Sequence, residues 1–236
     1  MAHSLSPTLF AGFFAEQGIP GTYEALRVIQ GQAADAILGL MREGYTGLNV
    51  TTPLKEEAFD AADACDDVAE FVRAANMVTF HDGRIEVGNS DGLGGVVALE
   101  KALGAPLAAR SVLLLGVGPT GRAIAYNATK AGAAVSIWNR TPTRAHALVG
   151  SLMGARVWAP GQRHAIAFST LPPGADLDDE VVAALQVVPL VLDANYGVRS
   201  KLGERLQRPV IDGYGMLIAQ AEIAFTMWRE LARSRA

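Results

Sequence analysis

The stretch Ser111–Gly121, which reads Ser-Val-Leu-Leu-Leu-Gly-Val-Gly-Pro-Thr-Gly, decides the fold expected for this chain. An apolar run leads directly into the pattern Gly-x-Gly-x-x-Gly, and an alanine-rich helical stretch follows. In a dinucleotide site Gly116 permits a tight turn, Gly118 lets the backbone approach the pyrophosphate, and Gly121 lets helix and strand pack closely. The phosphates would lie at the positive end of the following helix. A second strand at Ala134–Trp138 would complete the unit.

The residues after that second strand indicate which dinucleotide binds. A site for NAD carries an acidic residue about 20 positions beyond the glycines, whereas a site for NADP carries arginine there. This chain has Asn139, Arg140, Thr141 and Arg144 at that point, and no acidic residue among them. Guanidinium groups match a phosphate in bidentate geometry, so the pattern favours NADP. The alternative is a solvated basic turn without a ligand.

Composition excludes several classes of protein. The chain has 236 residues, half of them hydrophobic, which is enough for one large domain or two small ones. Its net charge of −4 implies no general attraction to nucleic acid or to an anionic membrane. No apolar run is long enough to span a membrane, and Met1–Ser4 lacks the features of a signal peptide. The single cysteine, Cys65, fits a reducing cytoplasm, and without a cysteine pair we expect no metal site.

The first part of the chain is expected to form an α/β unit of its own. The expected elements are a helix opened by Ser6-Pro7 and ended by Gly18, a strand at Thr22–Val28, a helix at Ala33–Arg42, a strand at Gly47–Val50, a helix opened by Thr52-Pro53, and a hairpin around Asp82-Gly83. Serine and threonine are good N-caps, so Ser6 and Thr52 are expected to cap their helices.

The second part, from about Ala109 to Pro209, alternates strands with helices. Its expected strands are Ser111–Leu115, Ala134–Trp138, Ala165–Ser169, Val188–Leu192 and Val210–Ile211. Such alternation predicts a parallel sheet with helices on both faces. The last segment, Gly215–Ala232, is expected to be a long amphipathic helix.

Lys55 and Asp91 are the titratable residues of most interest. Lys55 would lie in the first turn of the helix that Thr52 caps, where a cation opposes the helix dipole. That position suits a lysine that exchanges protons, although an exposed, solvated lysine is an equal alternative. Asp91 precedes a glycine-rich helix start, where it could be an N-cap or could share a substrate hydroxyl with Lys55.

Several neutral polar residues have two interpretations as well. Ser4 and Ser6 lie at a helix start, where hydroxyls either cap the helix or bind a carboxylate. Asn76, Asn89 and Gln220 lie beside apolar runs, and their amides could bind hydroxyl groups or serve the structure alone.

Taken together, these stretches resemble the shikimate dehydrogenase family. The matching motifs are Ser4-Leu5-Ser6-Pro7, Asn49-Val50-Thr51-Thr52-Pro53-Leu54-Lys55, Ala75-Asn76, Asn89-Ser90-Asp91-Gly92, the glycine turn, Asn139-Arg140-Thr141, and Gly213 through Met216-Leu217 to Gln220. They occur in family order over nearly the whole chain. The resemblance implies two α/β domains with the active site in the cleft between them. Residues 1–93, completed by the C-terminal helix 213–236, would bind substrate, and residues 94–212 would form a Rossmann-like NADP domain.

The resemblance also implies a role for each of these residues. Lys55 and Asp91 would be the catalytic pair. The substrate would be held by Ser4 and Ser6 at its carboxylate, with Tyr196 as a further contact, and by Asn49, Thr51, Asn76 and Gln220 at the ring hydroxyls or the reacting group. NADP would be held by Gly116, Gly118, Thr120, Gly121, Asn139, Arg140, Thr141, Arg144 and Gly213.

The activity implied is the reversible, NADP-dependent reduction of 3-dehydroshikimate to shikimate in aromatic amino-acid biosynthesis. The implied protein is cytoplasmic, binds neither nucleic acid nor membrane, and is a monomer or a homodimer. Three alternatives stay open. They are a quinate/shikimate dehydrogenase of the same family, a non-catalytic NADP-binding relative, and a dehydrogenase of a bicyclic or folate-type substrate on a related fold.

Three features depart from the family pattern. Ser90 stands where members usually have threonine, which keeps a hydroxyl. Pro119-Thr120 stands where small residues are common, and Pro119 has no N–H to offer a phosphate. Members normally begin with an apolar strand, which Met1-Ala2-His3 does not supply, so we expect unpaired edges in the N-terminal sheet.

Overall fold

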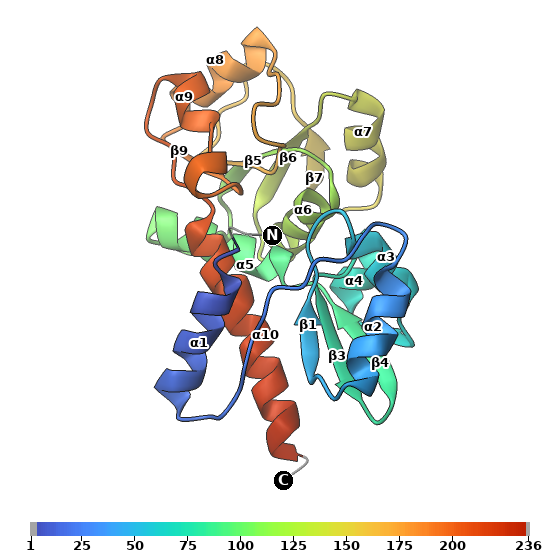
Figure 1. Cartoon of the computed structure of the whole chain (residues 1–236). Helices are drawn as coiled ribbons and strands as arrows, with labels where there is room; N and C mark the ends of the chain where they lie inside the picture. The colour runs from blue at the N-terminus through green and yellow to red at the C-terminus, as the bar shows by residue number, and fades with distance from the viewer. Residues whose placement is uncertain (1–3, 235–236) are drawn as a thin grey trace. The chain divides into compact units, whose positions relative to one another are not determined.

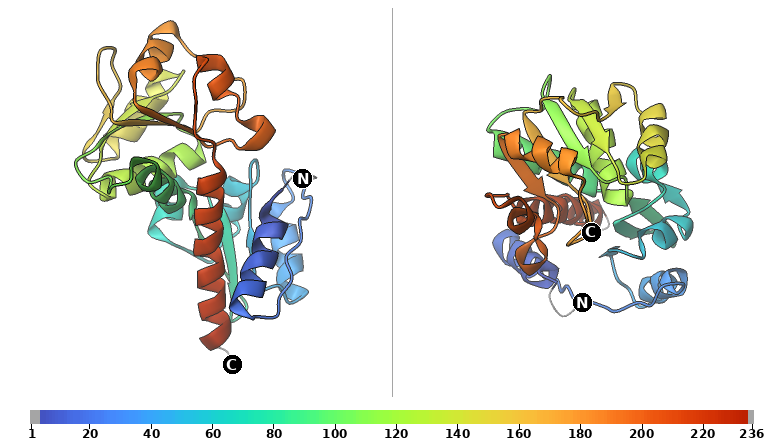
Figure 2. Two further views of the ribbon diagram at one scale, coloured as in Figure 1. Left: turned by 90° about the vertical axis from the view of Figure 1, so that its left-hand side faces the viewer. Right: turned by 90° about the horizontal axis from the view of Figure 1, so that it is seen from above.

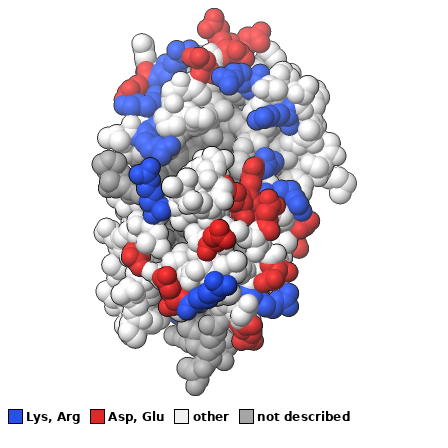
Figure 3. Space-filling model, turned by 45° about the vertical axis from the view of Figure 1, so that its right-hand side comes forward, with Lys and Arg blue, Asp and Glu red and all other residues white. Residues whose placement is uncertain are grey.

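The computed structural model describes residues 4–234, with side chains described as far as Leu231. Residues 1–3, where an opening strand would be sought, lie outside this range. The chain forms two compact units: unit 1 comprises residues 1–90 and 220–236, and unit 2 comprises residues 91–219. On the face drawn in Figure 3, acidic and basic side chains are interspersed. Among the described helices, none combines the length and the apolar character that crossing a membrane requires.

Unit 2 is built on a parallel five-stranded sheet (Figure 1). Its strands are β5 (Ser111–Leu115), β6 (Ala134–Trp138), β7 (Ala155–Val157), β8 (Ile166–Ser169) and β9 (Leu190–Asp193), in the spatial order β7-β6-β5-β8-β9. Leu114 at the centre lies opposite Ile137 on one side and Phe168 on the other. The predicted parallel sheet is confirmed. The strand predicted at Val210–Ile211 is wrong in extent, because only a single bridge joins Ile211 to Leu192.

Helices cover both faces of this sheet, as predicted. They are α5 (Asp91–Leu103), α6 (Pro119–Lys130), α7 (Pro142–Gly150), α8 (Asp179–Val187), the short 3-10 helix η1 (Gly197–Arg199) and α9 (Leu202–Leu206). Leu113 and Leu115 of β5 pack with Val181 and Leu185 of α8. Phe168 points to the other face, where it lies against α5. Strands buried on both faces are continuously apolar, which explains why the sequence pattern was strong here.

Unit 1 contains a smaller mixed sheet. Its strands are β1 (Gly47–Asn49), β2 (Ala64–Cys65), β3 (Met77–His81) and β4 (Arg84–Gly88), in the order β1-β3-β4-β2. β3 pairs antiparallel with β1 and β4, and β2 pairs parallel with β4. The predicted hairpin is confirmed: Asp82 and Gly83, with φ of 49° and 75°, form a turn of the kind that favours glycine.

The helices of unit 1 pack on this sheet and on one another. They are α1 (Ser6–Gln17), α2 (Ala33–Arg42), α3 (Lys55–Asp60), α4 (Asp67–Val72) and the greater part of α10 (Tyr214–Ser234). α1 lies beside α10, as the left view of Figure 2 shows. An aromatic cluster joins them: Phe10 contacts Phe225 with ring centroids 6.2 Å apart and stacks on Tyr23 at 4.1 Å.

Two local predictions for unit 1 are wrong. Residues 22–28 form no strand and pair with none of the described strands, because Tyr23 is instead stacked on Phe10 of α1. The caps also differ. The residue before α1 is Leu5, and no side chain caps that helix. α3 begins at Lys55 rather than Pro53, because a turn closed by the Leu54 N–H and the Thr51 carbonyl precedes it. Its N-cap is therefore Leu54, and Thr52 does not cap it.

Candidate active site

A buried network of amide and hydroxyl groups lies around Asn76 in unit 1. Asn76 directly precedes β3 and is 3% exposed. Its Nδ2 donates to Ser90 Oγ and to Gln220 Oε1, both at 3.0 Å, and its Oδ1 accepts from the Ser90 N–H at 2.8 Å. Gln220 is 144 residues away in sequence, on α10. The structure therefore brings two predicted substrate-binding amides into contact.

A second branch of the network reaches the start of α1. Tyr23 Oη donates to Asn49 Oδ1 at 3.0 Å, and Asn49 Nδ2 lies 3.5 Å from the Asn76 carbonyl. Burial raises the pKa of Tyr23 to about 12, while its hydrogen bond with the Ser6 side chain acts in the opposite direction. Tyr23 is therefore neutral and can donate. The Ser6 N–H lies 3.4 Å from Ser4 Oγ, so both predicted serines lie at the end of this branch.

Lys55 is held next to this network by its backbone. It is the first residue of α3, as the dipole argument required, and only 9% of it is exposed. Its carbonyl accepts from the Ala75 N–H at 2.8 Å, so α3 is tied to the residue before Asn76. The interpretation of Lys55 as an exposed, solvated lysine is wrong. Thr51 is exposed in the turn that leads into α3.

Asp91 lies in unit 2, at the start of α5. It is 2% exposed, and its Oδ2 accepts a hydrogen bond of 2.9 Å from Thr120 Oγ1. Thr120 lies in the first turn of α6 and was predicted to touch the cofactor. Lys55 and Asp91 belong to different units, so their action as a pair stays a prediction.

The glycine turn after β5 has the shape that a dinucleotide requires. Gly116 has φ of +100°, a conformation that side-chain-bearing residues rarely adopt. A Cβ on Gly121 would lie 2.2 Å from the Gly116 carbonyl oxygen, so helix and turn could not approach as they do. Gly118 is the N-cap of α6, and a Cβ there would meet nothing within 4 Å. The backbone at Gly118 therefore borders open space at the positive end of a helix, where an anion is favoured.

The turn after β6 lies beside the glycine turn. The Gly116 N–H donates to the Trp138 carbonyl at 2.9 Å, which holds the two turns at one edge of the sheet. Asn139 Nδ2 donates to the Thr141 carbonyl at 3.0 Å and shapes the second turn. Arg140 and Arg144 are exposed, and their guanidinium groups suit a phosphate at this edge. These residues fit NADP.

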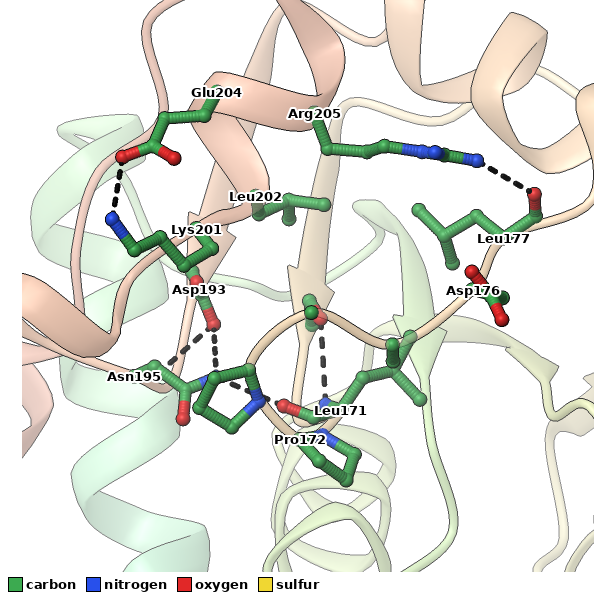
Figure 4. A pocket seen from close by; sticks show the side chains of 14 residues that line it. Leu171, Pro172, Asp176, Leu177, Asp193, Asn195, Lys201, Leu202, Glu204 and Arg205 are labelled. Atoms are coloured by element: carbon green, nitrogen blue, oxygen red, sulfur yellow. Dashed lines mark hydrogen bonds and ion pairs between the residues drawn. The ribbon is translucent and has the colours of Figure 1, made fainter.

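The carboxyl ends of β8 and β9 border a cavity of about 260 Å³ (Figure 4). Asp193 is buried there, and its Oδ1 accepts from the Asn195 N–H at 3.0 Å and from Asn195 Nδ2 at 2.8 Å. Its Oδ2 accepts from Ser200 Oγ at 3.0 Å. The Asp193 carboxylate thus fixes the loop that contains Tyr196, which is half-buried and precedes η1. Gly213 is needed for packing, because a Cβ there would lie 2.2 Å from the Ala194 carbonyl oxygen.

Two residues of these networks were missed in the sequence. Tyr23 sits in an alternating run that indicated a strand, and nothing local to it points to Asn49. Asp193 had a usable signal, because it ends a buried parallel strand, and polar residues at that edge commonly serve a site.

Comparison with known proteins identifies the family of this chain. Residues 1–78 match the family model described as the shikimate dehydrogenase substrate binding domain. A protein of Methanothrix thermoacetophila named shikimate dehydrogenase (NADP(+)) is 35% identical, over 97% of this chain and 88% of that protein. The chain belongs to the shikimate dehydrogenase family. Another family member, from Acidovorax sp. strain JS42, is 32% identical over 97% of this chain and 88% of that protein.

Solved structures agree with this family, and its fold also occurs in proteins with other names. Shikimate 5-dehydrogenase from Thermus thermophilus, solved with NADP(H) and shikimate, has a TM-score of 0.81 at 30% identity, covering 96% of this chain and 89% of that one. The Ael1 enzyme from Pseudomonas putida has a TM-score of 0.87 at 32% identity, covering 97% and 90%. A 5-ketofructose reductase of Gluconobacter sp. strain CHM43 shares the fold at 24% identity, with a TM-score of 0.76 and coverage of 96% and 88%. The fold alone therefore does not select the substrate.

Proposed function

We propose that this family member is an NADP-dependent shikimate dehydrogenase, which interconverts 3-dehydroshikimate and shikimate in aromatic amino-acid biosynthesis. The network of Asn49, Asn76 and Gln220 in unit 1, with Lys55 tied to Ala75, carries the proposal. Neutral amides both donate and accept hydrogen bonds, which suits a substrate with several hydroxyl groups. Two serine hydroxyls two residues apart, together with Gln220, favour a small hydroxylated carboxylate over a bicyclic or folate-type substrate.

The substrate carboxylate would be bound by Ser4 and Ser6 at the start of α1. Their hydroxyls are two residues apart, and the dipole of a 12-residue helix adds a favourable field for an anion. Residues 1–93 with 213–236 would hold the substrate, and residues 94–212 the cofactor. Thr51 and Tyr196 would add further contacts with the substrate.

NADP would be held by backbone and arginine groups of unit 2. The pyrophosphate would lie at Gly118, and the ribose phosphate at Arg140 and Arg144, with Asn139 and Thr141 shaping the turn. Gly116, Gly121 and Gly213 would shape the surrounding backbone. When bound, NADPH would supply the hydride for reduction of the carbonyl, and NADP⁺ would accept a hydride in the oxidation direction.

The proton would move through Lys55. As the carbonyl oxygen of 3-dehydroshikimate gains negative charge, the Lys55 ammonium stabilises that charge and donates a proton from Nζ, leaving a neutral amine and the new hydroxyl. In the oxidation direction, neutral Lys55 accepts the hydroxyl proton. Asp91 would accept a hydrogen bond from the same hydroxyl or from Lys55 and so orient both.

The test is absorbance at the reduced-nicotinamide band with purified protein. Shikimate and quinate are each offered with NADP⁺ and with NAD⁺. We expect the fastest signal with shikimate and NADP⁺. Faster turnover of quinate would replace the proposal with the quinate/shikimate alternative. If the absorbance changes in none of the four mixtures, although the protein is folded and binds NADP⁺, the result would support a non-catalytic relative.

The substitution Arg140→Ala tests whether the protein prefers NADP⁺ to NAD⁺ for the reason proposed. Loss of charge-assisted hydrogen bonds to the ribose phosphate should raise the Kd for NADP⁺ roughly tenfold. The Kd for NAD⁺, which lacks that phosphate, should change less than about twofold. Calorimetric titration with both nucleotides measures this, and Arg163→Ala, remote in sequence from both turns, is the control. Equal weakening of both nucleotides would contradict the assignment of Arg140.

A further inference from the structure

The hydroxyl of Thr120 makes a hydrogen bond outside its own helix. Thr120 lies in the first turn of α6, where a threonine commonly bonds to its own turn or to a nearby backbone group. Its Oγ1 is instead 2.9 Å from Asp91 Oδ2 at the start of α5. Thr129, on the same helix, shows the ordinary behaviour, since its Oγ1 bonds to the carbonyls of Ala125 and Tyr126, both at 2.9 Å.

Close packing of α5 on α6 creates this contact. A Cβ on Gly92 would lie 2.2 Å from Asn127 Nδ2 and 2.3 Å from the Ala123 carbonyl oxygen. A Cβ on Gly95 would lie 2.6 Å from Ile124. The two glycines let the helices approach until the first turn of α6 reaches the Asp91 carboxylate.

The chemistry of a hydroxyl limits what Thr120 can do. Threonine has one O–H to donate, and both a carboxylate and a phosphate are acceptors. While that proton lies on Asp91 Oδ2, the same hydroxyl cannot donate to a pyrophosphate. Asp91 is buried, and an ionised carboxylate in such a place needs donors.

We infer that Thr120 is a positioning residue for Asp91 and that its side chain is not a phosphate ligand. The inference rests on the proposed function, in which Asp91 orients Lys55 and the reacting hydroxyl. By holding Oδ2, Thr120 fixes the rotation of the carboxylate and so the direction of Oδ1. It also ties the turn that would receive the cofactor to the carboxylate that would orient the proton transfer.

The first experiment compares Thr120→Val with Thr120→Ser in the whole chain. Valine keeps the shape and removes the hydroxyl, and serine keeps the hydroxyl. We expect Thr120→Val to lower kcat for shikimate oxidation about tenfold, the size of a lost hydrogen bond to a charged group. The KM for shikimate and the Kd for NADP⁺ should change less than about twofold, and Thr120→Ser should restore most of kcat. Thr129→Val, which removes a hydroxyl from the same helix, should leave all three values near those of the unmodified protein.

A double-mutant cycle shows whether Thr120 acts through Asp91. In the Asp91→Asn background the loss caused by Thr120→Val should shrink to less than about twofold, because the carboxylate it positions is gone. The Kd for NADP⁺, measured by calorimetry, should stay constant around the whole cycle. A full tenfold loss in both backgrounds would overturn the inference.

Other outcomes overturn it as well, and they differ from failure of the proposed function. If Thr120→Val raises the Kd for NADP⁺ while kcat is unchanged, the hydroxyl is a phosphate ligand. If Thr120→Val matches the unmodified protein in every value, Asp91 needs no positioning by Thr120. An unmodified protein that does not oxidise shikimate contradicts the proposed function itself, and the positioning of Asp91 for that reaction fails with it.

Discussion

Unit 1 and unit 2 build their candidate sites from different parts of the chain. In unit 2 the candidate cofactor site is largely backbone: Gly116 bends the turn, Gly121 allows close approach, and Gly118 leaves space at the end of α6. In unit 1 the candidate substrate site is a network of side chains, in which Asn76 contacts Ser90 and Gln220. The comparison teaches that a backbone site concentrates its signal in a few adjacent glycines. A side-chain network spreads its signal over the whole sequence.

The largest effect should come from Lys55→Ala in unit 1. Removal of a general acid typically costs a factor of about 10² to 10⁴ in rate, so we expect kcat to fall within that range. The Kd for NADP⁺ should change little, because the candidate cofactor groups lie in unit 2. Steady-state kinetics and calorimetry measure the two quantities. Lys101→Ala, an exposed lysine on α5, is the control, and near-normal kcat in Lys55→Ala would remove Lys55 from the mechanism.

The second prediction compares two glycines of the same turn. Gly121→Ala should lower the stability of unit 2 by about 2–3 kcal/mol, because its Cβ would overlap the Gly116 carbonyl oxygen. Gly118→Ala should cost less, about 0.5–1 kcal/mol, since its Cβ meets open space and only the poorer N-cap preference of alanine is felt, yet it should weaken NADP⁺ binding. Hydrogen exchange of β5 and α6 amides in urea measures stability. Equal destabilisation by both would show that Gly118 also serves packing.

The third prediction compares two substitutions that remove different numbers of hydrogen bonds from the network of unit 1. Asn76→Leu should destabilise this unit by about 2 kcal/mol, because the buried Ser90 and the half-buried Gln220 lose their partner. Tyr23→Phe keeps the ring stacked on Phe10 and removes only the bond to Asn49, so about 1 kcal/mol is expected. Urea unfolding followed by hydrogen exchange in β3 gives both values. A larger loss from Tyr23→Phe would reverse the order of importance in the network.

The smallest effect concerns pH and a buried histidine of unit 2. His164 is 5% exposed, and neither ring nitrogen has a hydrogen-bond partner among the described residues. Burial lowers the pKa of His164 below its ordinary 6.5, and the charge of Arg156 adds to the lowering. The folded protein therefore binds this proton less readily than the unfolded chain, so stability is full above about 6.5 and falls as the pH drops below it.

His164→Leu should flatten that part of the pH dependence. The free energy of unfolding is measured for both proteins between mildly acidic and neutral pH, and the difference isolates His164. His146→Leu, at an exposed position, is the matched substitution for comparison. An unchanged slope in His164→Leu would assign the pH dependence to other groups.

Unit 2 was the more predictable half, for a physical reason. Strands buried on both faces are continuously apolar, so β5, β6, β8 and β9 could be located from sequence alone. β7, with three residues, is too short to show a period. In unit 1 the alternating run at residues 22–28 looked like a strand, but Tyr23 stacks on Phe10 of α1, Leu26 is exposed, and the run pairs with no described strand.

The candidate site divides in the same way. From the sequence alone, the glycine turn with its arginines, the positions of Lys55 and Asp91 at helix starts, and the family resemblance could all be read, because each depends on residues that are neighbours in the chain. Tertiary structure decided that Asn76 meets Gln220, that Tyr23 joins Ser6 to Asn49, and that Thr120 donates to Asp91. Those contacts depend on how closely helices and strands pack, and a hydrogen bond between distant residues leaves no local pattern in either of them.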